Sequence, residues 1–123
     1  MEKILIIDDS PVQASFLKSL LAPDYEIAVA NTAEAGLEQA KIGDYSLILL
    51  DVIMPGMDGF ELLKKLQEEV VLLHTPVILI TSLSDIQNEE RGLTLGAVDY
   101  ITKPFHPAIV RARVHTHIKL YQY

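Results

Sequence analysis

Five short apolar runs recur along this 123-residue chain, and their character limits the folds that it can adopt. The first, third and fourth are continuous rather than alternating, which is typical of strands buried on both faces of a sheet. The second is more polar, as expected for a strand at the edge of a sheet. The runs are Ile4–Ile7, Tyr25–Val29, Leu47–Leu50, Val77–Ile80 and Val98–Ile101.

The stretches between these runs have helical periodicity. Ser10 followed by Pro11 is typical of a helix start, and Pro23 predicts the end of that helix. The other predicted starts are Asn31 (paired with Glu34), Asp58, about Asp85, and His106-Pro107, and Gly43 is the predicted end of the second helix. The side chains expected to face the core are Val12, Phe16, Leu17, Leu20, Leu21, Ala33, Leu37, Ala40, Phe60, Leu63, Leu66, Val70, Val110, Val114, Ile118 and Tyr121.

Strand and helix therefore alternate five times along one domain, residues 1–123. Parallel strands need helical crossovers, and right-handed crossovers give a doubly wound α/β sheet with helices on both faces. Sites in such sheets form beyond the carboxyl ends of the strands, where the strand order reverses.

Composition excludes several classes of function. The net charge of −7 disfavours a nucleic-acid surface. The lack of cysteine excludes disulfides, thiolate catalysis and Cys-ligated zinc. No apolar stretch approaches the length needed to span a bilayer, and no signal-peptide core follows Met1. We therefore expect a protein that binds neither nucleic acid nor membrane, in the cytoplasm.

Polar residues follow four of the runs: Asp8-Asp9, Asp51, Thr81-Ser82 and Lys103. Clustered carboxylates repel each other unless a cation lies among them, and oxygen ligands favour Mg²⁺ or Mn²⁺ over zinc. An aspartate can accept a phosphoryl group as an acyl phosphate, and the phosphoryl oxygens then need neutralising. This neutralisation can come from the metal, from Lys103, and from the Thr81 hydroxyl together with backbone N–H groups. We therefore predict that Asp51 is the nucleophile of a magnesium-dependent phosphoryl-acceptor site.

Each of these residues also has an ordinary structural interpretation. An aspartate after a strand is usually a helix cap or a turn former. Thr81-Ser82 could cap the following helix, and Lys103 could be a solvated loop lysine. Their occurrence together, each at the same end of a different strand, favours the functional interpretation.

The chain resembles a response-regulator receiver domain of two-component signalling over its whole length. The matching segments are Ile4–Ser10, Leu49–Gly59, Ile80–Ser82 and Gly96–Phe105. The resemblance implies a flavodoxin-like sheet with strand order 2-1-3-4-5, which is the known order of the chemotaxis receiver and is carried over from it. It also implies that a histidine kinase or phosphotransfer protein phosphorylates Asp51 in a phosphorelay.

Further roles follow from the resemblance. Asp9, Asp51 and the Ile53 carbonyl would bind Mg²⁺ directly, Mn²⁺ being a possible substitute, with Asp8 assisting through water. Thr81 and Lys103 would contact phosphoryl oxygens, and Tyr100 would turn inward when Thr81 moves toward the phosphate. A cis peptide is implied between Lys103 and Pro104. The helix at about 85–95, the strand Val98–Ile101 and the final helix would form the surface that changes.

Two further expectations concern lifetime and context. Ile53 and Leu83 are apolar residues placed to exclude water from the phosphoryl group, which predicts a long-lived phosphoryl-aspartate. The alternative is that they only pack loop edges. The helical pattern from Val110 to Tyr123 has no stop signal, which resembles receivers joined to a cyclic-di-GMP enzyme or within a hybrid kinase. We therefore expect the N-terminal part of a longer protein, and a homodimer is possible.

Other classes of function fit the residues less well. A haloacid-dehalogenase-type phosphatase needs Asp-x-Asp after the first strand, but Ser10 takes the place of the second Asp. A flavodoxin-like electron carrier needs a phosphate loop after Ile7, and a degenerate docking receiver would not need an intact acidic set. His115 and His117 lie two apart on a predicted helix, so they point to different faces and are expected to be solvated. We expect a switch, not an enzyme, whose only chemistry is its own phosphorylation and autodephosphorylation.

Overall fold

A five-stranded parallel sheet forms the centre of the protein in a computed structural model that describes residues 1–54, 57–82 and 86–121. The sheet order is β2-β1-β3-β6-β7, which is the expected order 2-1-3-4-5 when only the strands of this sheet are counted. The elements are β1 (Lys3–Ile7), α1 (Pro11–Leu21), β2 (Glu26–Ala30), α2 (Ala33–Ile42), β3 (Leu47–Asp51), β4 (Ile53–Met54), β5 (Met57–Asp58), α3 (Gly59–Glu68), η1 (Val70–Leu72), β6 (Val77–Ser82), α4 (Ile86–Thr94), β7 (Asp99–Lys103) and α5 (Pro107–Leu120).

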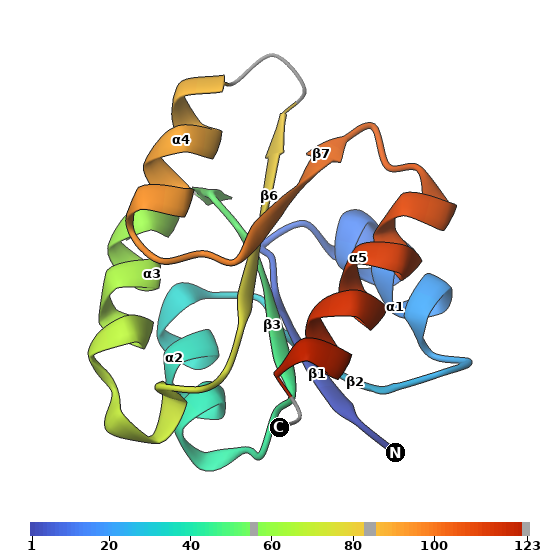
Figure 1. Cartoon of the computed structure of the whole chain (residues 1–123), viewed down its shortest axis with the longest axis horizontal. Helices are drawn as coiled ribbons and strands as arrows, with labels where there is room; N and C mark the ends of the chain where they lie inside the picture. Colours follow the sequence, from blue (N-terminus) through green and yellow to red (C-terminus); the bar gives the residue numbers. More distant parts are fainter. Residues whose placement is uncertain (55–56, 83–85, 122–123) are drawn as a thin grey trace.

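Helices cover both faces of the sheet, as Figure 1 shows. Successive strand residues point to opposite faces, so that Leu5 and Ile7 pack with α2 and α3 in one cluster. Ile4 and Ile6 pack with α1 and α5 in the other. The two layers explain why β1 is apolar from Ile4 to Ile7 and β3 from Leu47 to Leu50. The strand β2 lies at the edge of the sheet, as predicted.

The helix caps follow local chemistry, with one correction. The Ser10 hydroxyl accepts the Gln13 N–H at the start of α1, and Pro11 takes the first helical position. Asp58 caps α3 and Gly43 ends α2, both as predicted. The predicted Asn31 cap is wrong, because Thr32 caps α2 by accepting the Ala35 N–H.

Several residues expected in the core are exposed. Val12 is 82% exposed and Phe16 is 45% exposed. Leu17 and Leu21 of the same helix are buried as predicted, and Ala14, which was not predicted, is buried with them. Val70 lies in the short 3-10 helix η1, and Tyr121 follows the end of α5 at Leu120. Both side chains are exposed. The predicted helix to Tyr123 therefore ends earlier, with residues 122–123 outside the described part.

A short antiparallel pair, β4–β5, lies directly after β3 and joins Ile53 to Asp58. This pair was not predicted. The predicted start of the fourth helix at Asp85 lies outside the described residues, and α4 is described from Ile86. None of the helices described is both long enough and apolar enough to cross a lipid bilayer.

Candidate functional site

The carboxyl ends of the parallel strands meet at one edge of the sheet and bring the predicted residues together. Asp8 directly follows β1, and Asp51 is the last residue of β3. Asp51 pairs in register with Ile80, and Ser82 pairs with Lys103. Residues that lie more than 40 positions apart in the sequence therefore share one edge, because the strands are parallel.

Three carboxylates form the acidic part of this site. One oxygen each from Asp8, Asp9 and Asp51 lies within 4.8 Å of the others. Asp8 and Asp51 are buried. Burial raises the pKa of Asp8 above its ordinary 3.8, and the charge of Asp51 adds to this, while the Ser10 N–H, Gln13 and Lys103 lower it.

The donor set fits a hard divalent cation. All three side chains offer carboxylate oxygen, the ligand type that Mg²⁺ binds, with its remaining positions filled by water and phosphate. Charge balance supports the same conclusion. Among the described residues, these three acids have one ammonium in contact, that of Lys103, which lies beside Asp51. The residues present therefore fit the cation that the sequence predicted.

Each oxygen of Asp51 has a defined partner. Oδ1 accepts the Ile53 N–H at 2.9 Å. Oδ2 lies 3.3 Å from Lys103 Nζ and accepts a hydrogen bond from Gln13 Nε2 at 2.7 Å. The Asp51 side chain is 3% exposed and that of Lys103 is 32% exposed, so the carboxylate is buried while the ammonium is partly in water.

The loop after Asp51 is held in place by a close backbone approach at Gly59. The Gly59 N–H donates to the Val52 carbonyl. A Cβ on this residue would lie 2.5 Å from Val52 Cα, so only glycine allows α3 to begin so close to the end of β3. The same loop contains Ile53, which is 56% exposed.

Thr81 and Lys103 complete the edge. The Thr81 side chain is fully buried, and its Oγ1 has no hydrogen-bond partner in the part of the chain that the structure describes. Lys103 precedes Pro104 through a cis peptide, as predicted. A buried hydroxyl without a partner is unusual in a folded protein and points to a ligand atom that it would contact.

Tyr100 lies on β7, half-buried, and is tied to α5. The Arg113 guanidinium lies 5.5 Å from the Tyr100 ring centre and donates to the Tyr100 carbonyl. His117 Nε2 lies 3.0 Å from an Asp99 oxygen, and its side chain is mostly buried. The prediction that His117 is solvated is therefore wrong, since this side chain of α5 packs against Asp99 of β7.

Gln13 is the site residue that sequence reasoning missed. Its amide nitrogen donates both to Asp51 Oδ2 and to Asp8 Oδ2. A signal was available: Gln13 is a long polar residue in the first turn of the helix that follows Asp8-Asp9 and the cap Ser10. Leu83, in contrast, was predicted to lie beside the phosphoryl position, and it lies outside the described residues.

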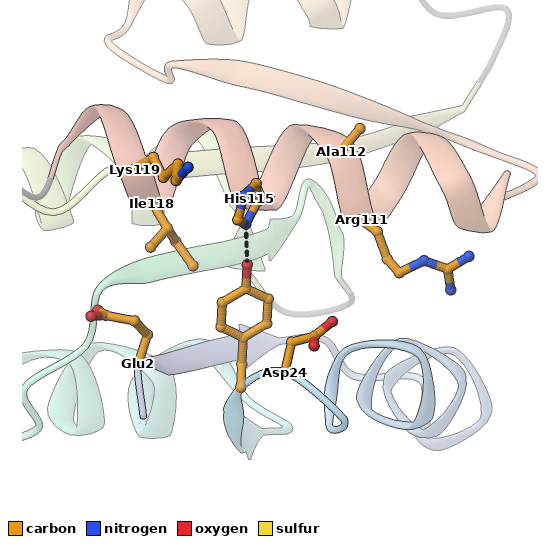
Figure 2. A pocket seen from close by; sticks show the side chains of 8 residues that line it. Glu2, Asp24, Arg111, Ala112, His115, Ile118 and Lys119 are labelled. Carbon is orange, nitrogen blue, oxygen red and sulfur yellow. Dashed lines mark hydrogen bonds between the residues drawn. The ribbon is translucent and has the colours of Figure 1, made fainter.

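A separate hollow of about 500 Å³ lies against α5, at the other end of the strands from the acidic site. Figure 2 shows His115, Arg111 and Lys119 on the helix above Glu2 and Asp24. The Tyr25 hydroxyl lies 3.2 Å from His115 Nδ1. Burial, Asp24 and Glu2 raise the pKa of Tyr25 above 10.0. His115 is exposed as predicted, but it is held by this contact, and it and His117 face different elements.

The family model for the response regulator receiver domain matches residues 4–115. The chain belongs to this family. This receiver domain is 39% identical over 116 residues to "Probable cyclic di-GMP phosphodiesterase" of Vibrio cholerae serotype O1, covering 94% of the chain and 26% of that protein. It is 35% identical over 119 residues to the cell cycle response regulator CtrA of Brucella ovis, covering 97% of the chain and 50% of that protein.

Solved structures of other receiver domains share this fold. The receiver domain of a signal transduction histidine kinase from Syntrophus aciditrophicus superimposes with a TM-score of 0.89 at 34% identity, over 99% of this chain and 93% of that one. The receiver domain thus spans between a quarter and a half of the curated relatives it matches. Receiver domains are signalling modules that work with histidine kinases or phosphotransfer proteins and bind Mg²⁺ at an acidic pocket.

Proposed function

We propose that this receiver domain accepts a phosphoryl group on Asp51 from a phosphohistidine, in a Mg²⁺-dependent reaction. The observation that carries the proposal is the surrounding of Asp51: a buried carboxylate 3.3 Å from the Lys103 ammonium and clustered with Asp8 and Asp9. The donor is a histidine kinase or a phosphotransfer protein, as for other members of the family.

The chemistry is a substitution at phosphorus. One Asp51 carboxylate oxygen forms a bond to phosphorus, the phosphorus–nitrogen bond of the donor breaks, and the electron pair stays on the imidazole. Lys103 then contacts one phosphoryl oxygen, and the unpartnered Thr81 hydroxyl donates to another. A bound Mg²⁺ would neutralise charge on the phosphoryl oxygens. Hydrolysis of the acyl phosphate by water returns Asp51, and we expect this to be the only chemistry of the domain.

The metal would be held by oxygen atoms at this edge of the sheet. Asp9, Asp51 and the Ile53 carbonyl would bind it directly, and Asp8 would contact it through water, with Mn²⁺ as a possible substitute. The position of Ile53 supports this role, because its N–H is bound to Asp51 Oδ1 and fixes the start of the loop.

The conformational change of the switch would begin at Thr81 and be transmitted to Tyr100. Movement of Thr81 toward the phosphoryl group leaves space into which the half-buried Tyr100 ring turns. Two such states need to differ by only a few kcal/mol. The surface that would change consists of α4, β7 and α5, where Arg113 holds both the ring and the carbonyl of Tyr100.

The output domain that we expect to accompany this domain is inferred from its relatives. We expect the domain to be the N-terminal part of a longer protein whose output is a cyclic-di-GMP enzyme or a hybrid kinase, and a relative named as a cyclic di-GMP phosphodiesterase supports this. A homodimer and a cytoplasmic location stay predictions. The open reading frame tests the first point, since a stop codon directly after Tyr123 contradicts it.

Acetyl phosphate with Mg²⁺ tests the central proposal through the intact mass of the protein. We expect the wild type to gain one phosphoryl group, and Asp51→Ala to gain none. Asp44→Ala is the matched control, because Asp44 is an exposed aspartate in the loop before β3 and should leave the adduct intact. An adduct on Asp51→Ala, or its formation in the presence of excess chelator, would contradict the proposal.

The lifetime of the adduct is a second measurement. Ile53 is exposed beside Asp51 and cannot orient a water molecule, so we expect slow loss of the phosphoryl group. An Ile53→Asn variant should lose it faster, because an amide can position the attacking water. An unchanged decay rate would support the alternative that Ile53 only packs the loop edge.

A further inference from the structure

Gln13 occupies a position in the acidic site that none of the roles above uses. It lies in the first turn of α1, where its backbone N–H is bound to the Ser10 hydroxyl at 3.3 Å. Its side-chain nitrogen donates to Asp51 Oδ2 at 2.7 Å and to Asp8 Oδ2. An amide nitrogen carries two hydrogens. Both hydrogens are therefore used, on acids at the ends of two different strands.

For Asp51, the consequence is that both lone pairs of one carboxylate oxygen, Oδ2, already accept hydrogen bonds. A carboxylate oxygen has two lone pairs, and Oδ2 already accepts from Gln13 and from Lys103. Oδ1 accepts the Ile53 N–H and keeps one lone pair. A cation or a phosphorus atom can therefore reach Oδ2 only when one of its two donors leaves.

For the pair of acids, the consequence is that hydrogen bonds from one amide partly stabilise both buried charges. Asp8 and Asp51 are buried, and burying like charges is costly unless donors or cations lie between them. Hydrogen bonds to ionised groups are about twice as strong as neutral ones. One amide that reaches both carboxylates thus does in part what a divalent cation would do.

We propose that Gln13 competes with Mg²⁺ for these carboxylates and thereby sets the metal affinity of the site. The inference rests on the proposed function. A cation that binds Asp51 through Oδ2, and that reaches Asp8 Oδ2 through water, would use lone pairs that the Gln13 amide now occupies. Gln13 is in this sense a positioning residue: it stabilises the metal-free site and weakens metal binding by the same contacts.

Calorimetric titration with Mg²⁺ tests the competition directly. Gln13→Met keeps the length of the side chain and removes its donors, so we expect binding about tenfold tighter than in the wild type, the equivalent of one hydrogen bond to a charged group. Gln67→Met is the matched control, because Gln67 Nε2 donates to the Gly96 carbonyl, away from the site. Its Mg²⁺ affinity should equal that of the wild type.

Urea unfolding gives a second readout that a purely structural role would not produce. Gln13→Met should be less stable than the wild type without Mg²⁺, because two buried carboxylates lose their donor. The difference should shrink or reverse at saturating Mg²⁺. Gln13→Ala, which removes the donors without filling the space, should shift both measurements in the same direction.

Unchanged or weaker Mg²⁺ binding in both Gln13 variants, with normal binding by the wild type, would overturn this inference and leave the proposed function standing. Absence of Mg²⁺ binding by the wild type, together with no phosphoryl adduct on Asp51, would overturn both.

Discussion

Lys103 Nζ lies 3.3 Å from Asp51 Oδ2, although the two residues are 52 positions apart in the chain. Asp51 ends β3 and Lys103 ends β7, and β6 lies between these strands in the sheet. The lysine therefore reaches across the width of one strand to meet the aspartate. The pair is asymmetric, because the carboxylate is buried and the ammonium is partly in water.

Replacing Lys103 with Met should destabilise the domain by about 1–2 kcal/mol, since it leaves a buried carboxylate with less compensation while water screens part of the loss. Urea unfolding at neutral pH without divalent cations measures this. Lys41→Met is the control, because Lys41 pairs at 3.5 and 3.9 Å with Glu38 and Glu69 on the surface, where a pair contributes about 0–1 kcal/mol. An equal loss of stability in both variants would mean that the Lys103–Asp51 pair contributes no more than a surface ion pair does.

Asp8→Asn should change how stability depends on pH. The pKa of Asp8 is raised in the folded protein above 3.8 by burial, so the folded state binds a proton more tightly than the unfolded state does. The stability that this gives is present below pH 3.8 and is lost as the pH rises through the raised pKa. The stability of Asp8→Asn relative to the wild type should therefore increase from pH 3.8 toward neutral pH. Paired urea titrations in chelator test this, and a relative stability that is constant or falls would contradict it.

Gly59→Ala should destabilise the domain by about 1–3 kcal/mol, the cost typical of forcing atoms into a packed place. Its new Cβ would meet backbone atoms of Val52 and Asp51, which cannot rotate away as a side chain can. Lys64→Ala, an exposed change on the same helix, should stay within about 0.5 kcal/mol of the wild type. Chemical unfolding of the two variants compares them, and a Gly59→Ala protein as stable as Lys64→Ala would show that α3 can move away from β3 freely.

Most of the fold could be predicted because the apolar runs are continuous, and only strands covered on both faces require that. The detail of α1 could not be predicted in the same way. Val12 and Phe16 share one helical stripe, and Ala14, Leu17 and Leu21 share another, and only packing against α5 and the sheet decides which is buried. The cap of α2 moved by one residue, to Thr32, because Asn31 and Thr32 are both good cap residues.

The site was predictable to the extent that strand ends fix positions. Asp8, Asp51 and Lys103 come together because parallel strands end at one edge. Gln13 could not be placed this way, because its contact with Asp51 depends on the direction in which α1 leaves β1 and on side-chain torsions. The His117–Asp99 contact was missed for a similar reason, since it depends on how α5 packs against β7.

Thr81→Val and Thr81→Ser should separate folding from switching. The Thr81 hydroxyl is buried without a partner among the described residues, so replacing it with a methyl group of the same shape should stabilise the resting domain by about 1 kcal/mol. Thr81→Ser keeps the hydroxyl and loses a methyl, which should cost about 1 kcal/mol. If the hydroxyl must move toward the phosphoryl group to release Tyr100, only Thr81→Ser will keep a phosphorylation-dependent change in amide hydrogen exchange on β7. A Thr81→Val protein that is less stable than the wild type, or that still shows this change, would mean that the hydroxyl has another role.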